Sequence, residues 1–131
     1  MAKASGDPTA VWEAVREFAL TLPGAVEEFP WGESVVKVNR KVFVFLGGGD
    51  GGPSPGITVK LADAEVHAHA LSCPDAAPAG YGLGRSGWVG VPLAPEGAPG
   101  AELLREWVEE SYRTVAPRRL VAELDAARSG G

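Results

Sequence analysis

Apolar side chains recur every three or four residues in two long stretches, residues 11–22 and 103–115, as they do on the buried face of a helix. Asp7 and Pro8 suit the start of the first helix, as its cap and first residue, and Leu22-Pro23-Gly24 suits its end. Pro117 breaks the second stretch and can open a last, shorter helix. The pattern therefore predicts one helix near the N-terminus and two near the C-terminus.

Between these helices the apolar residues form short runs that are typical of strands. Asn39-Arg40 is a plausible two-residue hairpin turn between the runs 35–38 and 42–46. Residues 42–46 are apolar on both faces, which favours a central strand, whereas Pro92 favours an edge position for the last run. The strand-like segments are 26–31, 35–38, 42–46, 57–61 and 88–93.

Three connecting segments complete the pattern. Residues 47–56 are rich in glycine and proline and predict a flexible loop. Asp63 can cap a short helix over residues 64–71, and residues 72–79 are predicted to be loop. A helix, a run of strands and then helices indicate a single α+β domain over residues 1–131, with flexible ends at 1–7 and 128–131.

The fold prediction is thus an antiparallel sheet covered by the N-terminal helix and the two C-terminal helices. One domain of this size builds one core. The aromatic residues predicted to be mostly buried in that core are Trp12, Phe18, Phe43, Phe45, Trp107 and Tyr112.

Composition narrows the classes of protein. Cys73 is the only cysteine, which excludes an internal disulfide and a cluster of thiolate metal ligands. No apolar run approaches the roughly 20 residues of a membrane helix, and residues 1–7 lack the apolar core of a signal peptide. A cytoplasmic protein, most simply a monomer, is expected, and Cys73 has no base beside it that would make it a nucleophile.

Several motifs are better explained without a ligand. Residues 47–52 and 82–87 both match GxGxxG, but neither match is followed by the helix that would hold a pyrophosphate. His67 and His69 would point apart on a helix, and the glutamates of residues 102–110 fit a solvated helix face. No catalytic constellation is recognisable, so the sequence predicts no metal, no cofactor and no enzyme.

The charge is unevenly distributed. The chain has a net charge of −5, yet residues 37–60 contain four cations and a single acid, Asp50. Contacts to a phosphate backbone need clustered cations, so an acidic protein can bind nucleic acid if its cations gather on one surface. The predicted contacts to phosphate are Lys37, Arg40, Lys41, Lys60 and Arg85.

An ordered set of short stretches resembles the MmcQ/YjbR-like family of small bacterial proteins over about residues 9–127. The resemblance implies a frataxin-like (CyaY-like) α+β fold, and it implies DNA binding because that fold is similar to the double-wing module of a phage transcription factor. The stretches are Leu22-Pro23-Gly24, Glu28-Phe29-Pro30-Trp31-Gly32, Lys37-Val38, Lys41-Val42-Phe43, Val59-Lys60-Leu61, Gly87-Trp88-Val89 and residues 110–117.

Two functions follow as hypotheses. The first is weak, salt-sensitive DNA binding by the hairpin and sheet surface, with Trp31 or Trp88 as a possible stacking platform. The second is a module that binds a small anionic ligand or a protein, with Trp31, Lys60, Trp88 and Arg113 lining its pocket. A shared convex face for the cations would favour DNA, and a concave pocket beside tryptophan would favour a ligand.

Overall fold

Six antiparallel strands and four α-helices make up the part of the chain that the computed structural model describes, residues 8–29, 34–47, 55–79 and 83–130. Trp31, Asp7 and most of the predicted glycine-rich loop, residues 48–54, lie outside the described residues. The elements are α1 (Pro8–Leu20), β1 (Ala25–Glu28), β2 (Ser34–Val38), β3 (Lys41–Gly47), β4 (Gly56–Lys60), α2 (Ala64–Leu71), β5 (Ala77–Pro78), the short 3-10 helix η3 (Leu83–Ser86), β6 (Trp88–Pro92), α3 (Ala101–Val115) and α4 (Arg118–Gly130).

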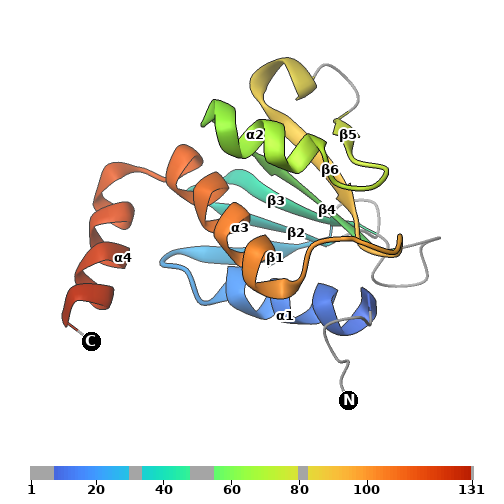
Figure 1. Cartoon of the computed structure of the whole chain (residues 1–131). Coiled ribbons are helices and arrows are strands. Elements are labelled where there is room, and N and C mark those ends of the chain that lie inside the picture. The colour runs from blue at the N-terminus through green and yellow to red at the C-terminus, as the bar shows by residue number, and fades with distance from the viewer. Residues whose placement is uncertain (1–7, 30–33, 48–54, 80–82, 131) are drawn as a thin grey trace.

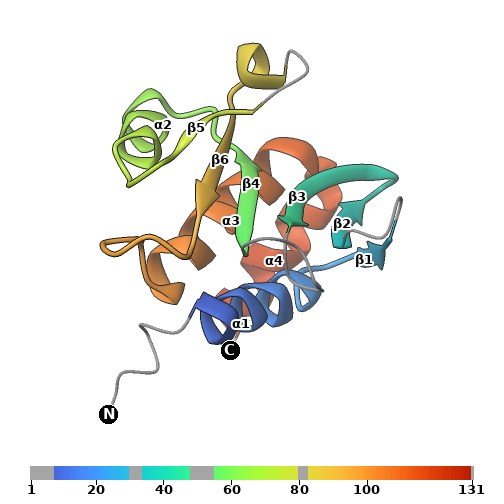
Figure 2. The ribbon, with the colours of Figure 1, turned by 90° about the vertical axis from the view of Figure 1, so that its right-hand side faces the viewer.

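The predicted α+β arrangement is confirmed. The strands follow the order β1-β2-β3-β4-β6-β5, and every pair is antiparallel. In Figure 1, α2 and α3 lie in front of the strands, α1 lies below them and α4 stands beside the sheet. Figure 2 shows the twist of the sheet, with β4 and β6 near the middle and β1 and β2 at the right. No described helix is long and apolar enough to cross a membrane.

Local signals account for the best-placed elements. Asp63 caps α2, because its carboxylate accepts a hydrogen bond of 2.9 Å from the backbone N–H of Val66. Asn39 and Arg40 form the hairpin turn between β2 and β3, with φ angles of 52° and 70°. The predicted central strand, β3, lies between β2 and β4.

Two sequence predictions were wrong. The segment predicted as loop, 72–79, contains the two-residue strand β5, which was too short to show a pattern. β6 lies between β4 and β5 and is not an edge strand. Pro92 is tolerated because β5 pairs only with Val89 and Gly90, so within the described residues β6 has no neighbour on that side at its end.

All the helices pack on one face of the sheet. Inward-facing valines from four strands, Val36, Val44, Val59 and Val89, pair directly across the sheet and are fully buried. Residues from α1, α3 and α4 complete this core. Burial of apolar area of this kind is the main favourable term in folding. Phe43, Trp107 and Tyr112 are buried as predicted, whereas Trp12 and Phe18 are half-buried at the margin of the core. Phe45 was predicted to lie in the core as well, and it does not.

The Ser111 hydroxyl of α3 is inserted between two strands. It donates a hydrogen bond of 2.5 Å to the carbonyl of Phe43 on β3 and accepts one of 2.9 Å from the backbone N–H of Lys60 on β4. The register of β3 and β4 would place Phe43 opposite Lys60, so the hydroxyl occupies the position of a direct bond between the strands. This contact fixes α3 to the sheet at one point.

A β-bulge in β3 makes room for this contact. Val36 of β2 is opposite Val44, but the next residue, Lys37, is opposite Val42, so Phe43 is an extra residue in its strand. Phe43 and Val44 are therefore both buried on the helix side. The Phe43 ring packs edge-on against Tyr112, with 5.2 Å between ring centroids, next to Ser111 in sequence.

Tyr112 also fixes the turn that follows α1. Its hydroxyl donates a hydrogen bond of 2.6 Å to the carbonyl of Pro23. The next residue, Gly24, has a φ of 75°, and a Cβ there would lie 3.0 Å from the Cδ1 of Leu120 on α4. Glycine is required at this position by both the backbone conformation and the close packing of α4.

A partly buried ion pair fixes α1 to the sheet. Arg16 donates hydrogen bonds of 2.7 Å and 2.6 Å to the two carboxylate oxygens of Glu27 on β1, and the hydroxyl of Ser34 donates a third. These bonds, with that from Arg16 the largest effect, lower the pKa of Glu27 although its partial burial opposes the shift. Bidentate arginine–carboxylate pairs of this kind have a specific geometry.

We predict that Ser111→Ala lowers the free energy of unfolding by about 2–4 kcal/mol, because it leaves a buried N–H and a buried carbonyl without their partner. Urea unfolding would measure the loss. Thr114→Ala is the matched control, since it removes an exposed hydroxyl from the same helix and should cost less than about 0.5 kcal/mol. Equal effects in the two variants would contradict the bridging role of Ser111.

Glu27→Gln should lower stability at pH 7 by about 1–2 kcal/mol, through the loss of a charge-assisted hydrogen-bond pair. Because folding lowers the pKa of Glu27, its contribution is present above its unfolded pKa of about 4.3 and disappears as the pH falls through the lower folded value. Wild type and variant should therefore differ less in stability at pH 3 than at pH 7. Glu28→Gln, which removes an exposed partner of Lys37, should change stability by less than about 0.5 kcal/mol at either pH.

Candidate functional site

The face of the sheet that the helices do not cover carries most of the predicted site. Alternation along the strands and the strand register place a separate set of side chains on this helix-free face. Its residues are Val26 and Glu28 of β1, Val35 and Lys37 of β2, Val42 and Phe45 of β3, Thr58 and Lys60 of β4, and Trp88 and Gly90 of β6.

A small apolar cluster lies at the centre of the helix-free face. Phe45 packs against Trp88 with 5.3 Å between ring centroids and 69° between the ring planes. Val35 is directly opposite Phe45 on the neighbouring strand. Val35 and Trp88 are 3% and 8% exposed, and neither belongs to the main core cluster. The sheet therefore has apolar packing on both faces, which explains why Phe45 does not lie in the main core.

Two of the predicted cations lie on this face beside the cluster. Lys60 is directly opposite Trp88 and makes no ion pair with any described residue. Lys37 is different, because its Nζ lies 3.0 Å from the carboxylate of Glu28. The free positive charge on the face itself thus comes from Lys60.

The other predicted cations lie at the ends of elements. Arg40 and Lys41 are exposed at the tip of the β2–β3 hairpin, and Arg85 is exposed on η3. None of the three forms an ion pair within the described residues. The structure therefore does not join all five cations in one patch. It places one on the helix-free face, one partly neutralised beside it, and three at element ends.

Arg40 occupies an unfavourable backbone position. Both central residues of the turn have positive φ, as in a type I′ hairpin, where asparagine followed by glycine is preferred. Asn39 suits the first position, but a Cβ makes Arg40 strained at the second. A positive φ at a residue that has a Cβ costs about 1 kcal/mol or more.

Arg113 does not belong to this face. Its guanidinium donates hydrogen bonds of 2.9 Å to Glu109 on the same helix and 2.7 Å to Asp125 on α4. Arg128 pairs with Glu109 as well, at 2.7 Å. These bonds to its neighbours raise the pKa of Arg113 and lower that of Asp125. Arg113 therefore joins α3 to α4 on the helix side, and the predicted pocket with Trp88, Lys60 and Arg113 is not assembled.

The predicted stacking platform is not available either. Trp88 is buried, with its ring packed against Phe45, so it cannot offer an open face to a base. Trp31 lies outside the described residues. Phe45 is half-buried and is the aromatic residue of this face that remains partly accessible. Sequence reasoning missed it, since the bulge in β3 obscured which of its apolar residues point away from the helices.

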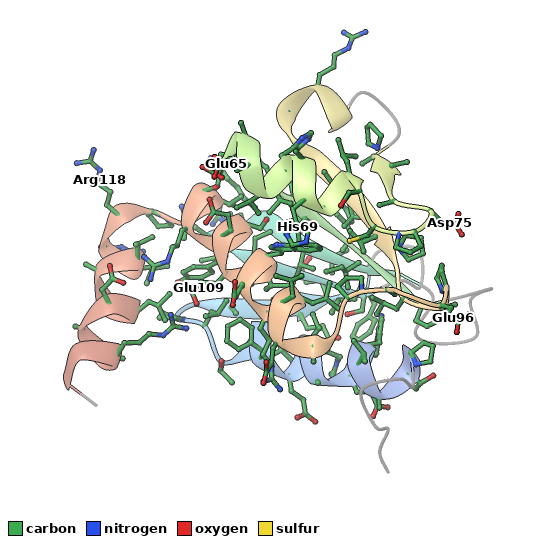
Figure 3. The ribbon with its side chains drawn as sticks, in the orientation of Figure 1. Glu65, His69, Asp75, Glu96, Glu109 and Arg118 are labelled. Atoms are coloured by element: carbon green, nitrogen blue, oxygen red, sulfur yellow. The ribbon has the colours of Figure 1, made fainter. Side chains whose placement is uncertain are left out.

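The helices on the opposite side carry acids and arginines together. Figure 3 shows Glu65 on α2 and Glu109 on α3, and it shows His69 directed from α2 toward α3. His69 lies edge-on to Trp107, with 5.5 Å between ring centroids. The helical acids are Glu13 and Glu17 of α1, Glu65 of α2, Glu102, Glu106, Glu109 and Glu110 of α3, and Glu123 and Asp125 of α4.

The described residues show no group of three or more His, Cys, Asp or Glu side chains that could hold a metal ion. Burial raises the pKa of the Cys73 thiol, which disfavours the reactive thiolate. A hollow of about 340 Å³ lies between the start of α1 and residues 93–99, and among the described residues that line it Glu96 is the charged one. An acid at the rim makes this hollow unsuitable for an anionic ligand.

Comparison with known proteins places the chain. The YjbR family matches residues 20–114, and no protein with curated annotation matches. The crystal structure of Deinococcus radiodurans protein DR2400, with domain DUF419, is similar with a TM-score of 0.63 and 25% sequence identity over 85% of each chain. The matched region runs from the end of α1 to the end of α3, and therefore includes the whole sheet and Ser111. The chain belongs to the YjbR family.

Proposed function

We propose that this protein binds nucleic acid, most simply duplex DNA, through phosphate contacts made by the hairpin tip and the helix-free face. The observation that carries the proposal is the different use of the cations in the fold. Arg40, Lys41 and Lys60, at the hairpin tip and on the helix-free face, make no ion pair within the described residues, whereas Arg16, Arg113 and Arg128 on the helices pair with carboxylates. A chain of net charge −5 can attract a polyanion only through such a local surface.

The proposed contacts carry no sequence information. Lysine and arginine at a turn and on a sheet contact phosphate oxygens, which position a protein on DNA without reading its bases. On the helix-free face, Phe45 and Thr58 lie beside Lys60, and the contacts that we propose from this face are to phosphate and not to base edges. We therefore infer weak, salt-dependent binding that is similar for all sequences, and a role that requires no catalytic group.

The strained turn supports this reading. Glycine in place of Arg40 would relieve the positive φ, so the arginine is retained at a cost to stability. A solvated arginine with no partner in the described residues adds nothing to the stability of the fold. Contact with an external anion is the benefit that we propose.

The test is the double variant Arg40→Gly/Lys41→Ala, titrated with random-sequence duplex DNA over a range of salt concentrations. We expect weaker binding to all sequences and a slope of log affinity against log salt that is smaller by up to about 2, near 0.9 for each lost phosphate contact. The same variant should be as stable as wild type or more so, because Arg40→Gly removes strain at the turn.

Arg118→Ala/Arg119→Ala is the matched control. It removes two exposed cations from the start of α4, where Figure 3 shows Arg118 directed into solvent, and it changes the net charge equally. Equal losses of affinity in both double variants would mean that only net charge matters. Absence of binding by wild type even at low salt would end the DNA hypothesis.

A small anionic ligand is the second candidate, and one observation favours it. Lys60 lies beside the Phe45–Trp88 cluster without an acidic partner among the described residues, so its amine can pair with an anion next to an apolar surface. We predict that Lys60→Gln abolishes binding of such a ligand but removes only one phosphate contact from DNA, which lowers the salt slope by about 0.9. Fluorescence titration with inorganic phosphate and with duplex DNA separates the two outcomes.

A further inference from the structure

The edge strand β1 carries exposed apolar side chains. The two large apolar side chains that are exposed among the described residues are Val26, at 54%, and Phe29, at 61%. Val26 lies in β1 and Phe29 directly follows it. Both therefore lie at the strand that forms one edge of the sheet.

The backbone of β1 is available on its outer side. Val38 pairs with Lys41 at the hairpin turn, so the backbone N–H and carbonyl of Val38 point to β3. Ala25 is opposite Val38, and its backbone N–H and carbonyl therefore point away from β2. The backbone N–H of Ala25 accordingly bonds to the carbonyl of Leu22. By alternation, Glu27 presents its N–H and carbonyl to the outside, while Val26 and Glu28 bond to β2.

The usual protection of a strand edge is weakened here. Charged side chains on an edge strand discourage the addition of another strand. Both charges of β1 are already satisfied within the chain, Glu27 by Arg16 and Glu28 by Lys37. The opposite edge of the sheet differs, because β5 has only two residues and one of them is Pro78.

The local charge identifies the kind of partner. Four carboxylates surround this edge, namely Glu13 and Glu17 beside Arg16 on α1, and Glu27 and Glu28 on β1. Arg16 and Lys37 are the cations beside them, so the edge is negative overall. A second copy of the chain would oppose acid to acid, and paired like charges on adjacent strands are destabilising.

We propose that β1 binds an extended segment of another protein by strand addition, and that this segment alternates apolar and basic residues. Its backbone pairs with the outward N–H and carbonyl of Glu27. Its apolar side chains cover Val26 on the helix-free face and reach Phe29 beyond the end of β1, and its cations lie on the other side of the strand, toward Glu27 and the acids of α1. Backbone bonds give affinity in this mode, and the alternate side chains give specificity.

The test uses an acetylated and amidated hexapeptide of alternating valine and lysine, titrated into the full-length, isotopically labelled protein and followed by NMR. We expect chemical-shift changes centred on β1 and at least about a tenfold slower hydrogen exchange of the Glu27 amide. The amides of Val26 and Glu28 are internal controls, since they already bond to β2 and should change less.

Matched variants and a matched peptide make the test decisive. Val26→Thr/Phe29→Ser should weaken binding at least about tenfold, because it removes exposed apolar area without touching the core. Ala77→Thr on β5 should leave binding unchanged. The peptide with glutamate in place of lysine should bind at least about tenfold more weakly.

Three results would overturn the proposal. The first is binding of the lysine peptide without added protection at Glu27, and the second is equal binding of the glutamate peptide. The third is a dimer of the free protein in analytical ultracentrifugation that Val26→Thr/Phe29→Ser abolishes, since the occupant of the edge would then be a second copy. Loss of DNA binding has no bearing on these outcomes, because the hairpin-tip cations and the β1 edge are tested by different variants.

Discussion

The hydroxyl of Ser111 connects the helical layer to the sheet at the point where the direct pairing of β3 with β4 ends. The direct ladder between β3 and β4 ends before Phe43 and Lys60, and the hydroxyl bonds to both of these residues instead. A side chain with both a donor and an acceptor is needed, so an apolar residue of similar size cannot replace it. Because Tyr112, the next residue, bonds to the turn after α1, the position of α3 determines where α1 and α4 pack as well.

The two sides of the molecule use their charges differently. On the helix side, charges are used within the protein, as in the bonds from Arg113 and Arg128 to Glu109 and from Arg16 to Glu27. On the helix-free face and at the hairpin tip, Lys60 and Arg40 have no such partners among the described residues. Membership of the YjbR family fixes the fold and leaves the function to be argued from this difference.

Sequence reasoning succeeded where one local signal decides the structure. Asp63 defined the start of α2, and Asn39-Arg40 defined the hairpin, because caps and two-residue turns depend on neighbouring residues alone. It failed where a distant residue decides. Arg113 was assigned to a ligand pocket because its partner Asp125 lies on another helix, and β5 was missed because its two residues have no pattern of their own.

Candidate-site residues followed the same rule. The exposure of Arg40 and Lys41 follows from the turn, and it was predictable. The neutralisation of Lys37 by Glu28 depends on the register of β1 against β2, and the burial of Trp88 depends on Phe45 from a strand that is distant in sequence. Phe45 could not be separated from Phe43 by periodicity, because residues 42–46 are all apolar and the bulge among them leaves no mark in such a run.

The extra residue in β3 works as a phase shift in the alternation of the hairpin. On the distal side of Phe43, the strand restarts its inward and outward order one residue later than an uninterrupted strand would. Val42 consequently points away from the helices, opposite Lys37. Deleting Phe43 would leave an ordinary ladder, with Val44 opposite Val36 and Val42 opposite Lys37, so the hairpin tip would keep its orientation while the core lost the ring that packs on Tyr112. The extra residue thus adds a core side chain on the helix side without changing how the hairpin presents Arg40 and Lys41, which precede it by three and two positions.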